Sequence, residues 1–173
     1  MTTYGNAPLN GVPRVDLTQL TYLVVSDNRF ARTFIKGALQ PYGLSHVQES
    51  MDVGKAVKLL ADVDVALAII DMEMNLLSGI DFTRLVRLGG EVRNDELPIL
   101  IASGNAERAT VEAAVNAGAN AYVVKPFSGE TLYSRIRSIL YHPVPFIRSP
   151  SYTGPDRRVR STAPPLTVDR RRG

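Results

Sequence analysis

The chain has 173 residues, a formal net charge of +3 and no cysteine. This length allows one domain of ordinary size with extensions, and the lack of cysteine excludes disulfides, thiolate metal sites and thiol nucleophiles. The charge is uneven, because residues 148–173 hold seven arginines and two aspartates, so that this segment carries +5 and the rest of the chain −2. The basic character belongs to the C-terminal segment and gives no reason to expect nucleic-acid binding by the remainder.

The sequence also argues against secretion and membrane insertion. Residues 1–10 contain no basic residue and no apolar core, unlike a secretory signal. Apolar runs such as residues 65–70 are far too short to cross a bilayer. We therefore expect a cytoplasmic protein.

Composition divides the chain into three parts. Residues 1–19 are polar and rich in turn formers, and we expect an N-terminal extension. Residues 20–141 alternate apolar runs with helical patterns, as in one folded domain. Residues 142–173 hold six of the eleven prolines and few large apolar residues, so burial there cannot offset the loss of chain entropy. We expect this segment to be disordered, without core contacts beyond about residue 148.

A strand followed by a helix recurs five times between residues 20 and 141. Apolar runs predict strands at residues 22–25, 65–70, 98–102 and 121–124, and a weaker pattern predicts a strand near residues 46–49. The intervening patterns predict a helix with Ala31, Phe34, Ile35, Ala38 and Leu39 on its buried face, which ends before Pro41, and further helices at about 51–61, 80–88 and 106–117. Ser128 is expected to cap a last helix that reaches about residue 140.

The strands are continuously apolar rather than alternating, which indicates a parallel sheet covered by helices on both faces. The predicted fold class is therefore α/β, a flavodoxin-like, doubly wound sheet of five parallel strands in the order 2-1-3-4-5. Functional sites in such sheets lie beyond the carboxyl ends of the strands.

Polar residues stand at those ends. Ser26 and Asp27 follow the first strand, Asp71 the third, Ser103 the fourth and Lys125 the fifth. Because these four strands are neighbours in the expected order, the side chains should converge on one pocket. Two carboxylates, a hydroxyl and an ammonium group suit Mg²⁺, which prefers oxygen ligands, together with a phosphoryl group.

Residues 20–141 resemble the receiver domain of two-component response regulators, in particular the stand-alone, chemotaxis-regulator type. The matching segments, in family order and at family spacing, are residues 23–28, 69–74 with 78–79, 97–104 and 117–127. The resemblance implies a phosphorelay signalling protein rather than an enzyme, with at most slow hydrolysis of its own aspartyl phosphate.

By position in these motifs, the resemblance implies a role for each pocket residue. Asp71 would accept the phosphoryl group from a histidine kinase or a histidine phosphotransfer protein. Mg²⁺ would bind Asp27, Asp71 and the backbone carbonyl of Glu73. Lys125 and Ser103 would contact the phosphoryl oxygens.

The resemblance also implies a switch and an output surface. Ser103 would move toward the phosphoryl group, and Tyr122 would turn inward as Ser103 moves. A downstream protein would bind the face made by the fourth helix, the fifth strand and the fifth helix. The peptide between Lys125 and Pro126 would be cis. About 32 residues follow the last predicted helix, too few for an output domain.

One position departs from the family pattern. The family usually has two adjacent acids after the first strand, but the first of them is Ser26 here. Glu73 stands where the family often has a neutral residue, so it could compensate for the lost charge. Two alternatives stay open: a pseudo-receiver that is never phosphorylated and acts as a protein–protein interaction module, or an adaptor whose arginine-rich tail binds nucleic acid or a membrane.

Overall fold

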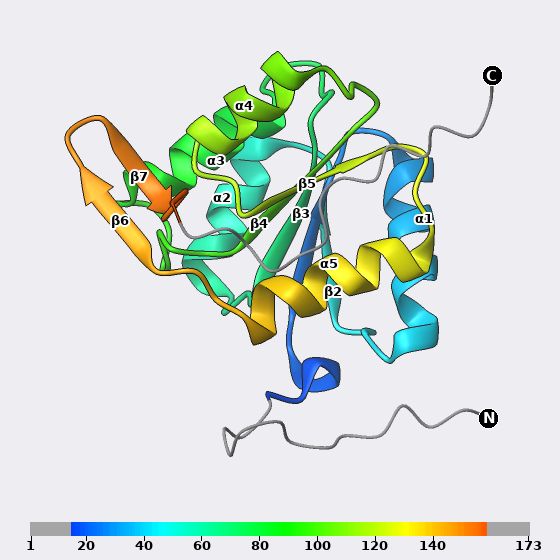
Figure 1. Ribbon diagram of the computed structural model, residues 1–173. Helices are drawn as coiled ribbons and strands as arrows, with labels where there is room; N and C mark the ends of the chain where they lie inside the picture. Colours follow the sequence, from blue (N-terminus) through cyan, green and yellow to red (C-terminus); the bar gives the residue numbers. More distant parts are fainter. Residues whose placement is uncertain (1–14, 159–173) are drawn as a thin grey trace.

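The computed structural model describes residues 15–158. It is a three-layer α/β structure in which one central sheet lies between two groups of helices (Figure 1). The layers follow from the sequence, because strands that are apolar on both faces need cover on both faces. Among the described residues, no helix is long and apolar enough to cross a membrane.

The central sheet has five parallel strands in the order β2-β1-β3-β4-β5, as predicted. The strands are β1 (Tyr22–Val25), β2 (Val47–Ser50), β3 (Leu67–Asp71), β4 (Ile99–Ser103) and β5 (Ala121–Val124). β1, β3 and β4 are buried along their whole length. β3 was expected at residues 65–70 but begins at Leu67, since its pairing with β1 starts there. Asp71 is consequently the last residue of the strand itself.

Two helices cover one face of the sheet and three cover the other. α1 (Arg29–Leu39) and α5 (Gly129–Tyr141) share an apolar core with one set of strand side chains. α2 (Val53–Asp62), α3 (Gly79–Leu88) and α4 (Arg108–Asn116) cover the opposite set. Two short 3-10 helices, η1 (Leu17–Gln19) and η2 (Gln40–Tyr42), precede β1 and follow α1.

Side-chain caps fix where the helices begin. Asn28 caps α1 and accepts hydrogen bonds from the amides of Phe30 (2.9 Å) and Ala31 (3.3 Å), directly after the loop that carries Ser26 and Asp27. The predicted cap at Ser128 is confirmed, because its hydroxyl accepts from the Thr131 amide at 3.1 Å. Caps of this kind satisfy amides that the first helical turn leaves without partners.

The predicted buried face of α1 was partly wrong. Ile35 and Leu39 are buried, but Phe34 is 51% exposed. Phe34 instead turns toward Phe127, with the ring centroids 5.8 Å apart. The helical period alone placed Phe34 beside Ile35, whereas the position of α5 decides how far the core extends around α1.

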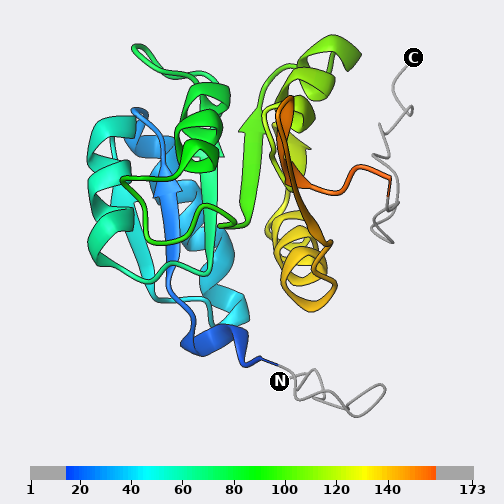
Figure 2. The same cartoon turned by 90° about the vertical axis from the view of Figure 1, so that its left-hand side faces the viewer.

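The C-terminal segment also differs from the expectation. Residues 142–173 were expected to be disordered, yet β6 (Phe146–Ser149) and β7 (Tyr152–Pro155) form an antiparallel hairpin. Figure 2 turns this hairpin (orange) toward the viewer. Gly154 and Pro155 in β7 are buried. The expectation that nothing beyond about residue 148 makes core contacts was therefore wrong for this hairpin.

Contacts with the domain explain why the hairpin forms. The buried guanidinium of Arg87 on α3 lies over the Phe146 ring, with Cζ 5.1 Å from the centroid. Gly154 lies against Gly118, where an added Cβ would be 2.8 Å from the Gly118 Cα. Arg148 forms ion pairs with Asp95 at 2.9 Å and with Glu96 at 2.7 Å. Composition had predicted disorder, but these long-range contacts supply the missing stabilisation.

The N-terminal boundary lies earlier than expected. Leu17 is buried, and its carbonyl accepts a hydrogen bond from the Tyr22 hydroxyl at 2.8 Å. The domain therefore begins before residue 20. The rest of the expected extension, residues 1–14, and the last part of the expected tail, residues 159–173, lie outside the described residues.

Candidate functional site

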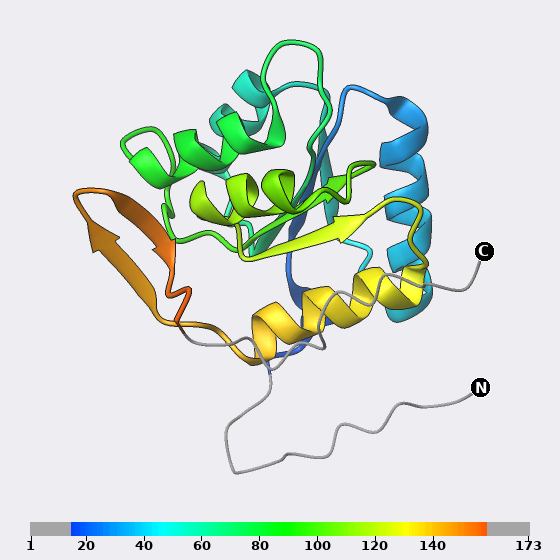
Figure 3. The same ribbon diagram turned by 45° about the horizontal axis from the view of Figure 1, so that its top comes forward.

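The predicted site residues lie at one edge of the sheet. Figure 3 brings this edge forward, where the loops leave the carboxyl ends of the strands. Asp71 and Ser103 are the last residues of β3 and β4, and Lys125 comes directly after β5. Ser26 and Asp27 come directly after β1. Parallel pairing of these strands puts all five positions at the same edge.

Asp71 is the centre of this arrangement and is only 4% exposed. Its Oδ1 accepts from the Lys125 ammonium at 2.6 Å and from the Glu73 amide at 3.2 Å. Its Oδ2 accepts from the Ser26 hydroxyl at 2.9 Å. The predicted approach of Asp71 and Lys125 is confirmed. The Lys125 contact gives this buried side chain a hydrogen-bonded partner of opposite charge, which offsets part of the cost of burying it.

Glu73 turns its carboxylate toward the ends of β4 and β5. Oε1 accepts a hydrogen bond from the Ser103 hydroxyl and another from the Gly104 amide at 3.1 Å. Oε2 lies 3.3 Å from Lys125 Nζ. Partial burial acts to raise the pKa of Glu73, but the hydrogen bond from Ser103 and the charge and hydrogen bond of Lys125 outweigh it, so the pKa lies below its usual value.

Asp27 has a different partner. Its Oδ2 accepts from the backbone amide of Asn75 at 2.9 Å and from the Asn75 side-chain amide at 2.5 Å. In residues 15–158, no group of three acidic or histidine side chains is gathered closely enough to hold a metal ion. Asp27, Asp71 and Glu73 therefore do not form such a group, and compensation by Glu73 for the charge missing at Ser26 stays a prediction. Asn75 is a partner that sequence reasoning missed, because only the folded loop brings it to Asp27.

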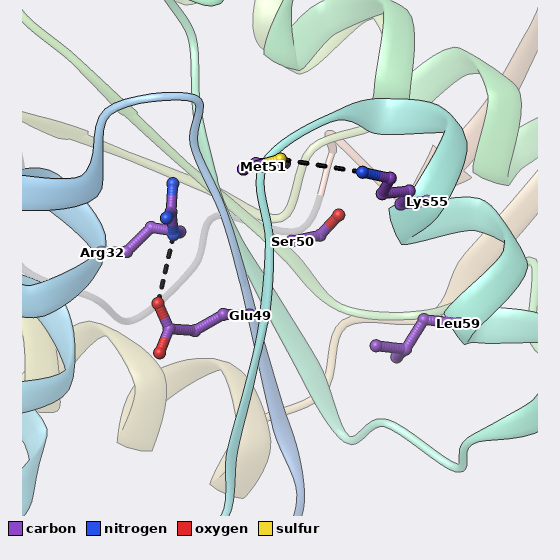
Figure 4. Close-up of a pocket in the computed structure, with 6 residues that line it drawn as sticks. All are labelled: Arg32, Glu49, Ser50, Met51, Lys55 and Leu59. Carbon is purple, nitrogen blue, oxygen red and sulfur yellow. Dashed lines mark hydrogen bonds and ion pairs between the residues drawn. The ribbon is translucent and has the colours of Figure 1, made fainter.

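Arg32 is a second missed residue, and it orients the loop after β1. Its guanidinium donates to the Ser26 carbonyl at 2.7 Å and to the Glu49 carboxylate at 3.1 Å. Figure 4 shows the Arg32–Glu49 pair beside a shallow pocket of about 260 Å³ between α1, β2 and α2. Glu49 also pairs with Lys36 at 2.5 Å. The spacing of Arg32 from Ser26 along the chain gave no signal of this contact.

The predicted switch residues are connected through Asn105. The Ser103 hydroxyl accepts from the Asn105 amide at 3.0 Å, and the Tyr122 hydroxyl donates to the Asn105 carbonyl at 2.7 Å. Tyr122 is buried, and this burial raises the pKa of its hydroxyl. The peptide between Lys125 and Pro126 is cis, as expected.

An apolar cavity of about 400 Å³ adjoins Asp71 and Lys125. Phe30, Phe34 and Phe127 line it, and Phe30 is among the most exposed large apolar residues of the described chain. Exposed aromatic side chains beside a buried carboxylate are typical of a surface that binds another molecule.

Comparisons with known proteins agree with this geometry. The family description "Response regulator receiver domain" matches residues 22–137. The chemotaxis protein CheY-3 of Vibrio cholerae is 32% identical over 117 residues, which cover 68% of this chain and 88% of that protein. The chemotaxis protein CheY of Pseudomonas aeruginosa is 33% identical over 117 residues, which cover 68% and 93%.

Solved structures show the same fold. The chemotaxis protein CheY4 of Vibrio cholerae aligns with a TM-score of 0.64 at 25% identity, over 70% of this chain and 98% of that one. The receiver domain of the sensor histidine kinase PA1611 of Pseudomonas aeruginosa, described with magnesium coordinated in its active-site cleft, aligns with a TM-score of 0.61 at 27% identity, over 68% and 94%. The chain belongs to the response regulator receiver domain family, a family of signalling modules rather than enzymes.

Proposed function

We propose that this protein is a phosphorylation-switched receiver in which Asp71 accepts the phosphoryl group. The observation that carries the proposal is the buried Asp71 carboxylate, held 2.6 Å from the Lys125 ammonium at the carboxyl edge of the sheet. A buried carboxylate with a cation on one oxygen is a candidate for covalent chemistry rather than a solvated turn former.

The proposed step is a phosphoryl transfer from a phosphohistidine. One Asp71 carboxylate oxygen forms a bond to phosphorus, while the bond from phosphorus to the donor nitrogen breaks and its electron pair stays on that nitrogen. Lys125 offsets the negative charge that accumulates on the phosphoryl oxygens. The Ser103 hydroxyl and the Gly104 amide point toward the same region and would donate hydrogen bonds there.

We propose Mg²⁺ as the cofactor, held by Asp27, Asp71 and the Glu73 backbone carbonyl. The donor set consists of hard oxygen ligands, and Mg²⁺ in proteins commonly uses one or two carboxylates and keeps several waters. The residues therefore fit the ion, although Ser26 in place of an acid lowers the local negative charge. When bound, Mg²⁺ would neutralise charge on the phosphoryl oxygens.

Two protein surfaces complete the proposal. The apolar cavity beside Asp71, with Phe30, Phe34 and Phe127, supports docking of a protein donor, either a histidine kinase or a histidine phosphotransfer protein. Ser103 and Tyr122 would carry the change to the face of α4, β5 and α5, where a downstream protein would bind. Such signalling would take place in the cytoplasm, and the acyl phosphate would end by slow self-hydrolysis.

Incubation with Mg²⁺ and acetyl phosphate, followed by mass spectrometry, tests this proposal. We expect one hydroxylamine-sensitive modification, at Asp71, because an acyl phosphate reacts with hydroxylamine. Asp71→Asn should abolish it, while the matched change Asp64→Asn, in the exposed loop between α2 and β3, should not. Labelling that persists in Asp71→Asn would show that the acceptor lies elsewhere.

The pseudo-receiver is the second candidate, and one observation favours it. Ser26 is fully buried and its hydroxyl donates to Asp71 Oδ2 at 2.9 Å. In a pseudo-receiver, this hydrogen bond from Ser26 would hold the Asp71 carboxylate in its unphosphorylated arrangement. Absence of any labelling at Asp71, under conditions that label a control receiver, would favour this function.

A further inference from the structure

The contacts of the Glu73 carboxylate are those that an anion at this site would make. The Ser103 hydroxyl donates to Oε1, and the Gly104 amide donates to Oε1 at 3.1 Å and to Oε2 at 3.3 Å. The Lys125 ammonium lies 3.3 Å from Oε2. These three donors come from the ends of two neighbouring strands and converge on one carboxylate.

One of these donors, Lys125, also contacts Asp71. Lys125 Nζ is shared between Asp71 Oδ1 at 2.6 Å and Glu73 Oε2 at 3.3 Å. The Glu73 amide also donates to Asp71 Oδ1 at 3.2 Å. Glu73 is thus anchored by its backbone to Asp71 and by its side chain to the donor set beside Asp71. Because a carboxylate and a phosphoryl group both present anionic oxygens to N–H and O–H donors, they compete for such a set.

We propose that the Glu73 carboxylate occupies the phosphoryl-oxygen subsite formed by Ser103, Gly104 and Lys125, and must leave it before an anion can bind. This inference rests on the proposed function of the site, but its geometry differs from charge compensation for Ser26. The Glu73 carboxylate contacts Ser103, Gly104 and Lys125 at the ends of β4 and β5, whereas Asp27 is bound by Asn75. The side chain is half exposed, so it can swing into solvent without disturbing the core.

The proposal predicts a change in anion affinity that needs no covalent chemistry. Glu73→Gln keeps the size of the side chain and removes its charge. The side chain should therefore bind Ser103, Gly104 and Lys125 more weakly. Exposed charge pairs contribute roughly 0.2–1 kcal/mol, so inorganic phosphate should bind Glu73→Gln up to about fivefold more tightly than the unchanged protein. Glu73→Ala should show at least the same gain. The matched control is Glu91→Gln, in an exposed loop at the opposite edge of the sheet.

The measurement is a phosphate titration of the full-length proteins, followed through the NMR amide resonance of Gly104. Tighter binding in both Glu73 variants, with Glu91→Gln equal to the unchanged protein, supports the proposal. Equal affinity in all four proteins, or a Gly104 resonance that phosphate does not move in Glu73→Gln, overturns it.

A parallel measurement separates this inference from the proposed function. With Mg²⁺ and acetyl phosphate below saturation, Asp71 should be labelled up to about fivefold faster in Glu73→Gln, for the same energetic reason. If phosphate binds Glu73→Gln more tightly but Asp71 is never labelled in any variant, the inference stands and the proposed function fails. If Asp71 is labelled at one rate in all variants and phosphate affinity is unchanged, the function stands and the inference fails.

Discussion

Arg87 binds the loops before β4 and β5 and lies over the Phe146 ring of the C-terminal hairpin, so replacing it should destabilise the whole protein. The side chain is 6% exposed on α3. It donates twice to the Gly118 carbonyl, at 3.0 and 2.8 Å, and once to the Asp95 carbonyl at 2.7 Å. A further bond reaches Asn120 Oδ1 at 3.2 Å. Arg87→Met keeps a long apolar stem but removes every one of these donors.

The magnitude follows from two opposing terms. Hydrogen bonds from a charged donor contribute about 1.5–3 kcal/mol each, so the loss at three acceptors is roughly 4–9 kcal/mol. Burial lowers the pKa of Arg87 from 12.5 to about 10, so removing the desolvated charge regains about 3 kcal/mol. The free energy of unfolding of Arg87→Met should therefore fall by about 3 kcal/mol, near the middle of the range that the two terms give. For a chain of this size that corresponds to a fall in Tm of roughly 6–12 °C.

Thermal unfolding monitored by circular dichroism measures this change. The matched control is Arg84→Met on the same helix, where the side chain is 63% exposed and 3.8 Å from Asp81. Such a surface pair should contribute less than about 0.5 kcal/mol. Amide hydrogen exchange in β6 and β7 should increase in Arg87→Met alone. A Tm within about 2 °C of that of Arg84→Met, a difference below about 1 kcal/mol, would refute the energetic argument.

Two further predictions concern the site and its support. Ser26→Asp should lower the Tm of the metal-free protein, because it places a second carboxylate against Asp71. Added Mg²⁺ should then raise Tm more in Ser26→Asp than in the unchanged protein. An equal rise in the two proteins would contradict this prediction. Hydrogen bonds and ion pairs with Lys36 and Arg32 outweigh burial and hold the pKa of Glu49 below its usual value. The contribution of the Glu49 carboxylate to the stability of the folded protein is therefore complete above about pH 4.5, and it is lost as the pH falls through the lowered pKa. Glu49→Gln should therefore lower Tm more near pH 6 than near pH 3, and an equal loss at both pH values would show that the charge of Glu49 is not responsible.

The sequence by itself was enough to predict the sheet and most of the site. Four of the five strands are continuous apolar runs, and the polar residue that ends or follows each of these runs is adjacent to it in sequence. Once the strands are parallel, those ends must share one edge, whatever the details of helix packing. This is why Asp71, Ser103 and Lys125 were predicted to meet, and why the structure brings them together.

The hairpin could not be predicted in the same way. Its strands are short and contain Gly154 and Pro155, and the surrounding prolines suggested disorder. The Pro-Ser pair at residues 150–151, between Phe146 and Tyr152, is only a weak turn signal in the sequence. The stabilising contacts come from Arg87 and Gly118, which are distant in sequence, so only the tertiary structure brings them to the hairpin.

The directions of individual side chains were also decided by the tertiary structure. Sequence placed Glu73 two residues after Asp71 but left open whether its carboxylate faced Asp27 or Lys125. The conformation of the loop after β3 places Asn75 where it donates hydrogen bonds to Asp27, and it directs the Glu73 carboxylate toward Ser103. Charge and spacing determine which groups gather at the edge of the sheet, because both are fixed by the chain. The sequence pattern is compatible with several pairings of the same charged groups. The conformation of the loops therefore decides which carboxylate oxygen accepts from which donor.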